Sequence, residues 1–495
     1  MSNKLNIRPL PVPDIPFVPK QVTNAAMIAY VAALLLCLVI YQQYALELRW
    51  MLFGLVEVCG FFFMSNQLSR SWVRSGPRTF ARNLFWWGFA LRAAWVVLSF
   101  FLYIEWTGQP FSIGAGDELF YDDVAHYGAR LIREGNWKIY SSIVAYGGGD
   151  VQFSDMGYPL YLTIIYWIFG DSIFMARIIK ALLGGWTAVL IYKLAARNFG
   201  EHTGRMAGIM CMLMPNLIYY CSMQLKEVEM VFLAMLFAER ADLLLRQKKL
   251  PWKALIALML IPMYLFMIRT ALAATLVLAF LCALLLSSQR VINSGRRTVL
   301  IVVASIAALV MVSTSTNIVS DVREMWQTGG STQQTFVEWT SQRVDKGGFK
   351  QGFAKYAGSA VFAPMIFTIP FPTMAETPGQ ENQKLIHGGN YVKNILSFFT
   401  ITTLLLLLAS GEWRKYVLPL AILCGYLVVL VFSNFAHSER FHLPILPLHL
   451  MMAAYGISKM KQFKYIKITY PYWCVLMIVA ALTWNWFKLA GRGMI

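Results

Sequence analysis

Apolar stretches of about 20 residues recur along the whole length of this chain. A helix needs about 20 residues to cross the hydrocarbon core of a bilayer, and only helices and closed barrels satisfy their backbone hydrogen bonds there. With 58% hydrophobic and 14% charged residues, the composition excludes an ordinary soluble globule. The sequence therefore predicts an all-α polytopic membrane protein.

The apolar stretches predict about 13 transmembrane helices. They lie near residues 24–41, 49–65, 84–104, 173–195, 204–222, 228–245, 253–269, 271–288, 298–315, 394–409, 416–434, 443–457 and 469–487. The polar, Pro-rich segment before the first stretch has no small-residue cleavage site, so we expect the first helix to remain as an anchor.

The basic connectors between these stretches predict the orientation. If there are about 13 spans, the connectors after the second, fourth, sixth, eighth, tenth and twelfth all fall on one side. They carry Arg70, Arg74, Arg78, Arg82, Arg197, Arg205, Arg246, Lys248, Lys249, Lys253, Arg290, Arg296, Arg297, Arg414, Lys415, Lys459, Lys461, Lys464 and Lys467. By the positive-inside rule this side is cytoplasmic, which places the N-terminus inside and the C-terminus outside.

The resulting division of the chain has six parts. We expect a cytoplasmic tail, N-terminal membrane helices, a first outer loop, a transmembrane core, a second outer loop and C-terminal membrane helices, at residues 1–23, 24–104, 105–172, 173–315, 316–393 and 394–495. Each outer loop contains a short apolar stretch, 158–170 and 361–372, that predicts an interfacial or partly inserted helix.

The charge and cysteine patterns exclude two further classes. The formal charge of +18 comes from Lys and Arg in short connectors, so it indicates membrane topology and anionic lipid headgroups rather than nucleic acid. All seven cysteines lie in or beside apolar stretches, without CxxC or Cys/His spacing. We therefore expect neither a disulfide framework nor a zinc site.

Carboxylates are concentrated in the first outer loop, and Asp117, Glu118 and Asp155 are its candidate catalytic residues. Apolar spacing after Gly116 predicts a helix over 117–134, with Asp117 at the position of an N-cap. Asp117 could cap this helix, act as a general base, or do both, because a carboxylate has several lone pairs. Two such acids could also share a divalent cation such as Mg²⁺ or Mn²⁺, and the spacing alone does not separate these options.

Basic residues on the expected outer side are scarce, and they need a physical reason there. Lys226 and Arg269 lie in short outer connectors, and Arg440 and His442 open the twelfth span. Each could reach lipid phosphates or pair with a nearby acid. At similar depth, they also indicate a shared anionic ligand such as a phosphate or pyrophosphate.

Several ordered motifs resemble the C-type superfamily of integral-membrane glycosyltransferases, in particular the branch with protein O-mannosyltransferases and the lipid A aminoarabinose transferase. The matching segments are Asp117–Tyr121 with Gly135–Trp137, Asp155–Tyr161, Gly170–Ser172 with Arg177, Phe199–Gly208, Arg269–Thr270 and Glu439–Pro447. This chain has two spans before the loop-bearing pair, where the family usually has one before the loop.

The resemblance implies an inverting enzyme that moves a sugar from a polyprenyl-phosphate or pyrophosphate carrier to an acceptor on the non-cytoplasmic face. Asp117 would then be the general base, and the four cations Lys226, Arg269, Arg440 and His442 would hold the donor phosphate. Tyr121, Tyr158 and Glu439 are expected to bind substrate. The expected location is a bacterial inner membrane with a periplasmic active site, and the acceptor could be a protein, a glycan or a lipid.

Two alternatives remain open. A polysaccharide polymerase or ligase would use the same donors with arginines and a histidine in a late loop, for which Arg323, Arg343 and His387 are available. A transporter or flippase of lipid-linked sugars would place ionisable groups at mid-membrane. The concentration of acids at the outer surface favours the transferase.

Overall fold

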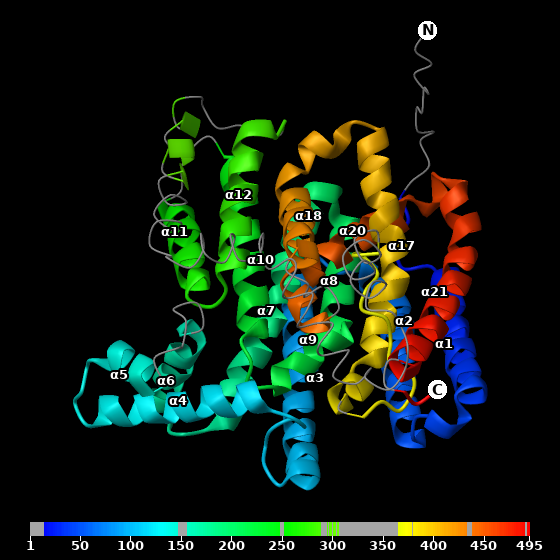
Figure 1. Ribbon diagram of the computed structural model, residues 1–495. Helices are drawn as coiled ribbons and strands as arrows, with labels where there is room; N and C mark the ends of the chain where they lie inside the picture. Colours follow the sequence, from blue (N-terminus) through cyan, green and yellow to red (C-terminus); the bar gives the residue numbers. More distant parts are fainter. Residues whose placement is uncertain are drawn as a thin grey trace.

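The computed structural model describes most of the chain. The described residues are 14–146, 156–247, 252–288, 295, 297–298, 300–302, 304–305, 365–378, 380–432, 438–490 and 493–495. Within these residues the regular secondary structure is helical, apart from one isolated bridge between Ala45 and Ala375 (Figure 1). The all-α prediction is therefore confirmed for the part of the chain that the structure describes.

The α-helices overlap the predicted apolar stretches except 298–315, which lies largely outside the described residues. They are α1 (Lys20–Ile40), α2 (Leu48–Ser71), α3 (Pro77–Thr107), α4 (Gly116–Arg133), α5 (Ile139–Tyr146), α6 (Gly157–Phe169), α7 (Ile173–Phe199), α8 (Glu201–Leu213), α9 (Pro215–Tyr219), α10 (Glu227–Leu245), α11 (Trp252–Phe266), α12 (Thr270–Leu286), α17 (His387–Ala409), α18 (Val417–Phe432), α19 (Glu439–His442), α20 (Leu446–Ser458) and α21 (Lys464–Ala490). Short 3₁₀ turns at η1 (Gln42–Tyr44), η2 (Trp72–Arg74), η4 (Tyr220–Ser222), η5 (Glu381–Leu385), η6 (Glu412–Lys415), η7 (Leu443–Ile445) and η8 (Lys459–Lys461) lie between or beside them.

Seven helical segments in the described part of the chain are long and apolar enough to cross a membrane. They are α1, α2 with η2, α3, α7, α17, the α19–η8 segment and α21. Helices α6, α11, α12 and α18 are apolar but shorter. The expected stretch 204–222 is divided at Met214 into α8 and α9, since Pro215 cannot continue the amide ladder. The expected count of about 13 spans stays a prediction.

Helices α4, α5 and α6 form a separate group at one end of the bundle, at the lower left of Figure 1. Helix α4 lies across the bundle, whereas α7, α12 and α17 run along it. It buries Tyr121, Val124, Ala125, Gly128, Ala129, Leu131 and Ile132, a set with helical spacing that confirms the predicted amphipathic helix. Helix α6 packs against α4 and matches the short helix expected at 158–170.

The N-terminus of α4 differs from the prediction. Ala115 occupies the N-cap position, without a side-chain capping hydrogen bond, and Asp117 lies inside the first turn. The expectation that Asp117 is the N-cap is therefore wrong. Gly114 has a φ of 72°, a left-handed conformation that suits glycine, and after this turn α4 begins at Gly116, one residue before Asp117.

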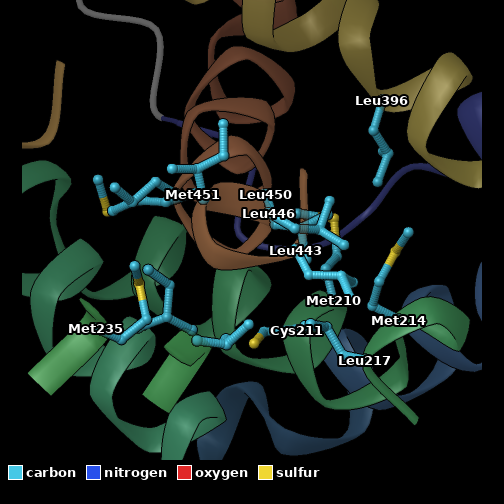
Figure 2. Close-up of a cluster of buried hydrophobic side chains, with 14 of the residues drawn as sticks. Met210, Cys211, Met214, Leu217, Met235, Leu396, Leu443, Leu446, Leu450 and Met451 are labelled. Carbon is cyan, nitrogen blue, oxygen red and sulfur yellow. The ribbon is translucent and has the colours of Figure 1, made fainter. Parts of the chain in front are cut away.

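Methionine and leucine side chains fill the centre of the bundle (Figure 2). They come from α8, α9, α10, α17, η7 and α20, and include Met210, Cys211, Met214, Leu217, Met235, Leu396, Leu443, Leu446, Leu450 and Met451. Flexible methionine side chains fill irregular gaps between helices that meet at different angles. Helix α10 also packs against η7, the turn between α19 and α20, and the residues that open α10 and α19 belong to the candidate site.

Contacts between connectors agree with the two membrane sides that the basic connectors predict. At one end, Asn382 before α17 donates to the carbonyl of Ile113 in the first outer loop at 2.7 Å. At the other, Arg205 donates to the carbonyl of Trp72 at 2.7 Å, and Lys459 pairs with Asp14 at 2.8 Å. The two loops expected outside thus meet at one end of the molecule.

Candidate active site

Arg440 joins two carboxylates from distant parts of the chain. Its Nη1 lies 2.6 Å from Asp117 Oδ2, across a sequence separation of 323 residues, and its Nε donates to Glu227 Oε1. The three residues come from the first turns of α4, α10 and α19. Asp117 of the first outer loop therefore meets Arg440 at the start of the α19–η8 segment.

The two carboxylates bound to Arg440 differ in exposure. The Asp117 side chain is 59% exposed, whereas that of Glu227 is 1% exposed. A carboxylate that is held by one arginine contact still has lone pairs for another donor. Asp117 is therefore positioned by Arg440 and open to a substrate, while Glu227 is an inner counter-charge.

Lys226 and Arg269 lie in the same neighbourhood as Arg440. Lys226 Nζ donates to the carbonyl of Ile268 at 3.0 Å, which brings it beside Arg269. The Arg269 guanidinium lies 4.4 Å from the ring centroid of Phe441, the residue after Arg440. Three of the four expected phosphate-binding cations are thus brought together, on α19 and the connectors before α10 and α12.

His442 makes a different contact. Its Nδ1 lies 3.0 Å from Lys393 Nζ on α17, and both side chains are buried. The carbonyl of Ile369 accepts a further hydrogen bond from Lys393. His442 therefore brings Lys393 of α17, which borders the predicted span 394–409, toward the start of α20.

Two of the three expected substrate-binding residues pack against each other. Tyr121 and Tyr158 form an edge-to-face pair with ring centroids 5.2 Å apart. Lys226 lies 5.9 Å from the Tyr121 ring, which connects this pair to the cations. The third residue, Glu439, accepts from Tyr220 at 3.0 Å and from Gln383 at 3.0 and 2.9 Å, so both of its oxygens are engaged.

Glu118 points into the protein although it is the neighbour of Asp117. It is 1% exposed and accepts from the Gln224 amide at 2.7 Å and from the Ser112 hydroxyl. Its Oε2 also lies 3.6 Å from Arg177 Nη2. This placement favours a structural role for Glu118 over contact with a substrate.

Asp155 lies outside the described residues, so the structure gives no position for the second expected acid. Among the residues it does describe, no three His, Cys, Asp or Glu side chains form a group that could hold a metal ion. The option of a divalent cation between Asp117 and Asp155 therefore stays untested.

The alternative late-loop residues are placed only in part. His387, at the start of α17, is fully buried, with Nε2 2.8 Å from the Tyr30 hydroxyl and Nδ1 2.8 Å from the Lys384 carbonyl. Arg323 and Arg343 lie outside the described residues. His387 therefore has the contacts of a packed interior residue.

A second set of charged side chains, Asp122, His126, Arg133 and Asp171, joins α4 to the connector between α6 and α7. Hydrogen bonding to Asp122 raises the pKa of His126, whose Nε2 lies 3.3 Å from Asp122 and whose Nδ1 lies 3.6 Å from Asp171. Arg133 lowers the pKa of Asp171 through a hydrogen bond, with N–O distances of 2.9 and 3.2 Å. These contacts fix the far end of the helix that carries Asp117.

Sequence reasoning missed Glu227, Gln383 and Lys393. Glu227 directly follows Lys226 at an expected outer helix start, so the same scarcity of charge there could have identified it. Lys393 borders an apolar stretch, and an interior lysine can indicate function. Gln383 carries no comparable signal.

The fold and the site together define a polytopic helical membrane protein whose charged centre lies at one end of its bundle. Two family models match this chain: dolichyl-phosphate-mannose-protein mannosyltransferase over residues 156–317, and the Alg9-like mannosyltransferase family over residues 385–494. Both are membrane glycosyltransferases of the C-type superfamily, so the resemblance stated from the sequence is confirmed.

The matched segments contribute to the same centre. Lys226, Glu227 and Arg269 lie in the first and Arg440 in the second, while Asp117 precedes both. No curated protein matches the chain.

Proposed function

We propose that this protein transfers a sugar from a polyprenyl-phosphate carrier to an acceptor hydroxyl on the non-cytoplasmic face of the membrane. Mannose is the first sugar to test, because both matched families are mannosyltransferases. The observation that carries the proposal is the half-exposed Asp117 carboxylate held by Arg440 beside further cations.

The chemistry follows from the charges at this centre. Asp117 accepts the proton of the acceptor hydroxyl, whose oxygen forms a bond to the anomeric carbon as the bond from that carbon to the phosphate oxygen breaks. Attack opposite the leaving group inverts the anomeric configuration. The electron pair leaves with the lipid phosphate, which becomes more negative in the transition state and is stabilised by fixed cations.

Three cations gathered at one centre suit an anionic donor. Lys226 and Arg269 lie in the neighbourhood of Arg440, which itself bridges the carboxylates of Asp117 and Glu227. A bound phosphate would share Arg440 with Asp117 and thereby weaken its hold on that carboxylate. Donor binding would then free a lone pair of Asp117 for the acceptor hydroxyl.

The membrane side and location belong to the proposal. Basic connectors at the opposite end support an outer position for the candidate site through the positive-inside rule. We place the protein in a bacterial inner membrane with its site toward the periplasm, where a lipid-linked donor enters sideways between helices. The acceptor is a protein, a glycan or another lipid.

Mass spectrometry of cell-envelope glycans, glycolipids and glycoproteins tests this function in cells. Cells with the protein should contain a hexose-modified species that cells without it lack, and Asp117→Asn should not restore that species. The proposal would be contradicted if cells with and without the protein had the same envelope glycans, glycolipids and glycoproteins, and if polyprenyl-phosphate mannose were not consumed.

A further inference from the structure

Buried charged side chains bind the backbone of residues 223–226, the connector between η4 and α10. Lys180 Nζ on α7 donates to the carbonyl of Met223 at 2.7 Å and to that of Leu225. Between these carbonyls, the Gln224 amide donates to Glu118 Oε2 at 2.7 Å. Three successive residues of the connector are thus held from two sides by charge-assisted hydrogen bonds.

Each of these charges has a counter-charge. Lys180 lies 3.8 Å from Glu229 on α10, and Glu118 lies 3.6 Å from Arg177 on α7. All four side chains are at most 3% exposed. Buried ion pairs stabilise little compared with apolar side chains of similar size, because desolvation offsets the attraction. Two pairs around one short connector therefore indicate a requirement for its geometry rather than for stability alone.

The connector carries residues of the candidate site. Lys226 ends it, reaching the Ile268 carbonyl and the Tyr121 ring, and Glu227 follows with its bond to Arg440. The Gln224 side chain donates to the Tyr166 hydroxyl on α6 at 2.9 Å, and Tyr166 donates to Asp122 on α4. A shift of this connector would move Lys226 and Glu227 together.

We propose that Lys180 and Glu118, each with its counter-ion, are positioning residues that fix the 223–226 connector and so set the place of Lys226 toward the donor phosphate. The inference rests on the proposed function, because it assigns Lys226 to a polyprenyl-phosphate ligand. It differs from the sequence-based assignment of Glu118, since Glu118 acts here through the connector and not on the substrate.

A double-mutant cycle on donor binding tests this inference. The ligand is a short-chain polyprenyl-phosphate mannose, and Kd is measured for the full-length protein in nanodiscs. Lys180→Gln should raise Kd about tenfold, within the range of coupling between residues of one network. In a Lys226→Gln background the same change should alter Kd less than twofold, because the residue through which Lys180 acts is already lost.

The control is Lys193→Gln, an exposed lysine on the same helix, which should leave Kd unchanged. If Lys180→Gln does not give folded protein, Glu118→Gln replaces it in the cycle, since one acceptor oxygen remains. The inference would be overturned if the positioning variant changed Kd equally with and without Lys226. It would also be overturned if that variant left Kd unchanged. A wild-type protein that does not bind the mannose donor would instead contradict the proposed function, and the inference with it.

Discussion

At the residue scale, the charge of Arg440 explains how an exposed aspartate is held in one place. Arg440 donates to both Asp117 and the buried Glu227. Because Glu227 is fixed inside the protein, it orients Arg440, and Arg440 in turn orients Asp117. A bidentate or bridging arginine orients its partners more firmly than a lysine could. As the proposed base, Asp117 held in this way would need little reorganisation when an acceptor arrives.

Replacing Arg440 with Gln tests the same contacts. The loss of a charge-assisted contact should weaken binding of a polyprenyl-phosphate donor about 10- to 100-fold. The free energy of unfolding should also fall by about 1–3 kcal/mol, because Glu227 is left buried without its partner. Donor titration and thermal unfolding in detergent measure the two effects.

Arg414→Gln is the matched control for Arg440→Gln. Arg414 lies in η6 at the opposite end of the bundle, where it contacts Trp413. Its replacement should change neither donor affinity nor the melting temperature measurably. Donor affinity that is unchanged in Arg440→Gln would show that Arg440 does not hold the phosphate.

At the element scale, α4 is the part of the site that the sequence describes best. Helical spacing of apolar residues locates it within one residue at each end, because an amphipathic surface helix has a strong period. The cap was misplaced, since the sequence does not show that Gly114 turns the chain before Ala115. The sequence also did not show that the Glu118 side chain points into the protein, because its partners Gln224 and Arg177 come from distant segments.

The contact of α4 with α6 predicts the effect of a small substitution. A Cβ atom at Gly128 would lie 2.5 Å from Thr163 Oγ1, so Gly128→Ala forces the two helices apart. Overpacking of this kind costs about 1–3 kcal/mol of stability. Thermal unfolding should show the loss, together with lower transfer activity because α4 carries Asp117.

Gly60→Ala on α2 is the corresponding control, because a Cβ atom there would meet nothing within 4 Å. This change should leave the melting temperature the same or raise it slightly, since alanine favours a helix over glycine. Equal melting temperatures for the two variants would show that α4 and α6 do not pack this closely.

The charged group at the far end of α4 predicts a pH dependence. The raised pKa of His126 means that its contribution is present below the ordinary value of 6.5 and is lost as the pH rises through the folded value. The lowered pKa of Asp171 means that its contribution is present above 3.8 and is lost as the pH falls through its folded value. The group, which includes Asp122 and Arg133, should therefore stabilise most between these limits.

His126→Gln isolates the histidine contribution. Melting temperatures of wild-type and variant should differ most near pH 5.5 and converge above about pH 8, where neither protein has a charge at this position. A difference that stays constant from pH 5 to pH 9 would mean that the imidazole acts through packing on the Tyr166 ring, 4.8 Å away, and not through charge.

At the scale of the whole molecule, apolar length and charge predict the helices, whereas the site depends on tertiary contacts. The spans around α1, α3, α7 and α21 follow from their length and composition. Helix α10 is less evident by this criterion, because it carries Glu229, Glu239 and Asp242 on buried positions. The sequence placed Asp117 and Arg440 only on the same expected side of the membrane. It could not predict their contact more directly, because no local pattern joins residues so far apart.

The orientation of the bundle predicts which residues are reachable from outside. In a background without the native cysteines, Gln109→Cys, exposed before α4, should react with a membrane-impermeant thiol reagent on intact cells. Arg78→Cys, exposed in the first turn of α3, should react only after the membrane is opened. The reverse pattern would place Asp117 in the cytoplasm and favour a nucleotide-sugar donor.

The central claim is that Asp117 is the base of a lipid-linked glycosyl transfer, and transfer by reconstituted Asp117→Asn tests it most directly. Protein in liposomes receives polyprenyl-phosphate mannose and an envelope extract that supplies acceptors, and labelled mannose in the product is counted. Asparagine keeps the size of the side chain and removes the base, so the rate should fall roughly 100- to 10,000-fold with a normal yield of folded protein. A variant that transfers mannose at nearly the wild-type rate would contradict the account.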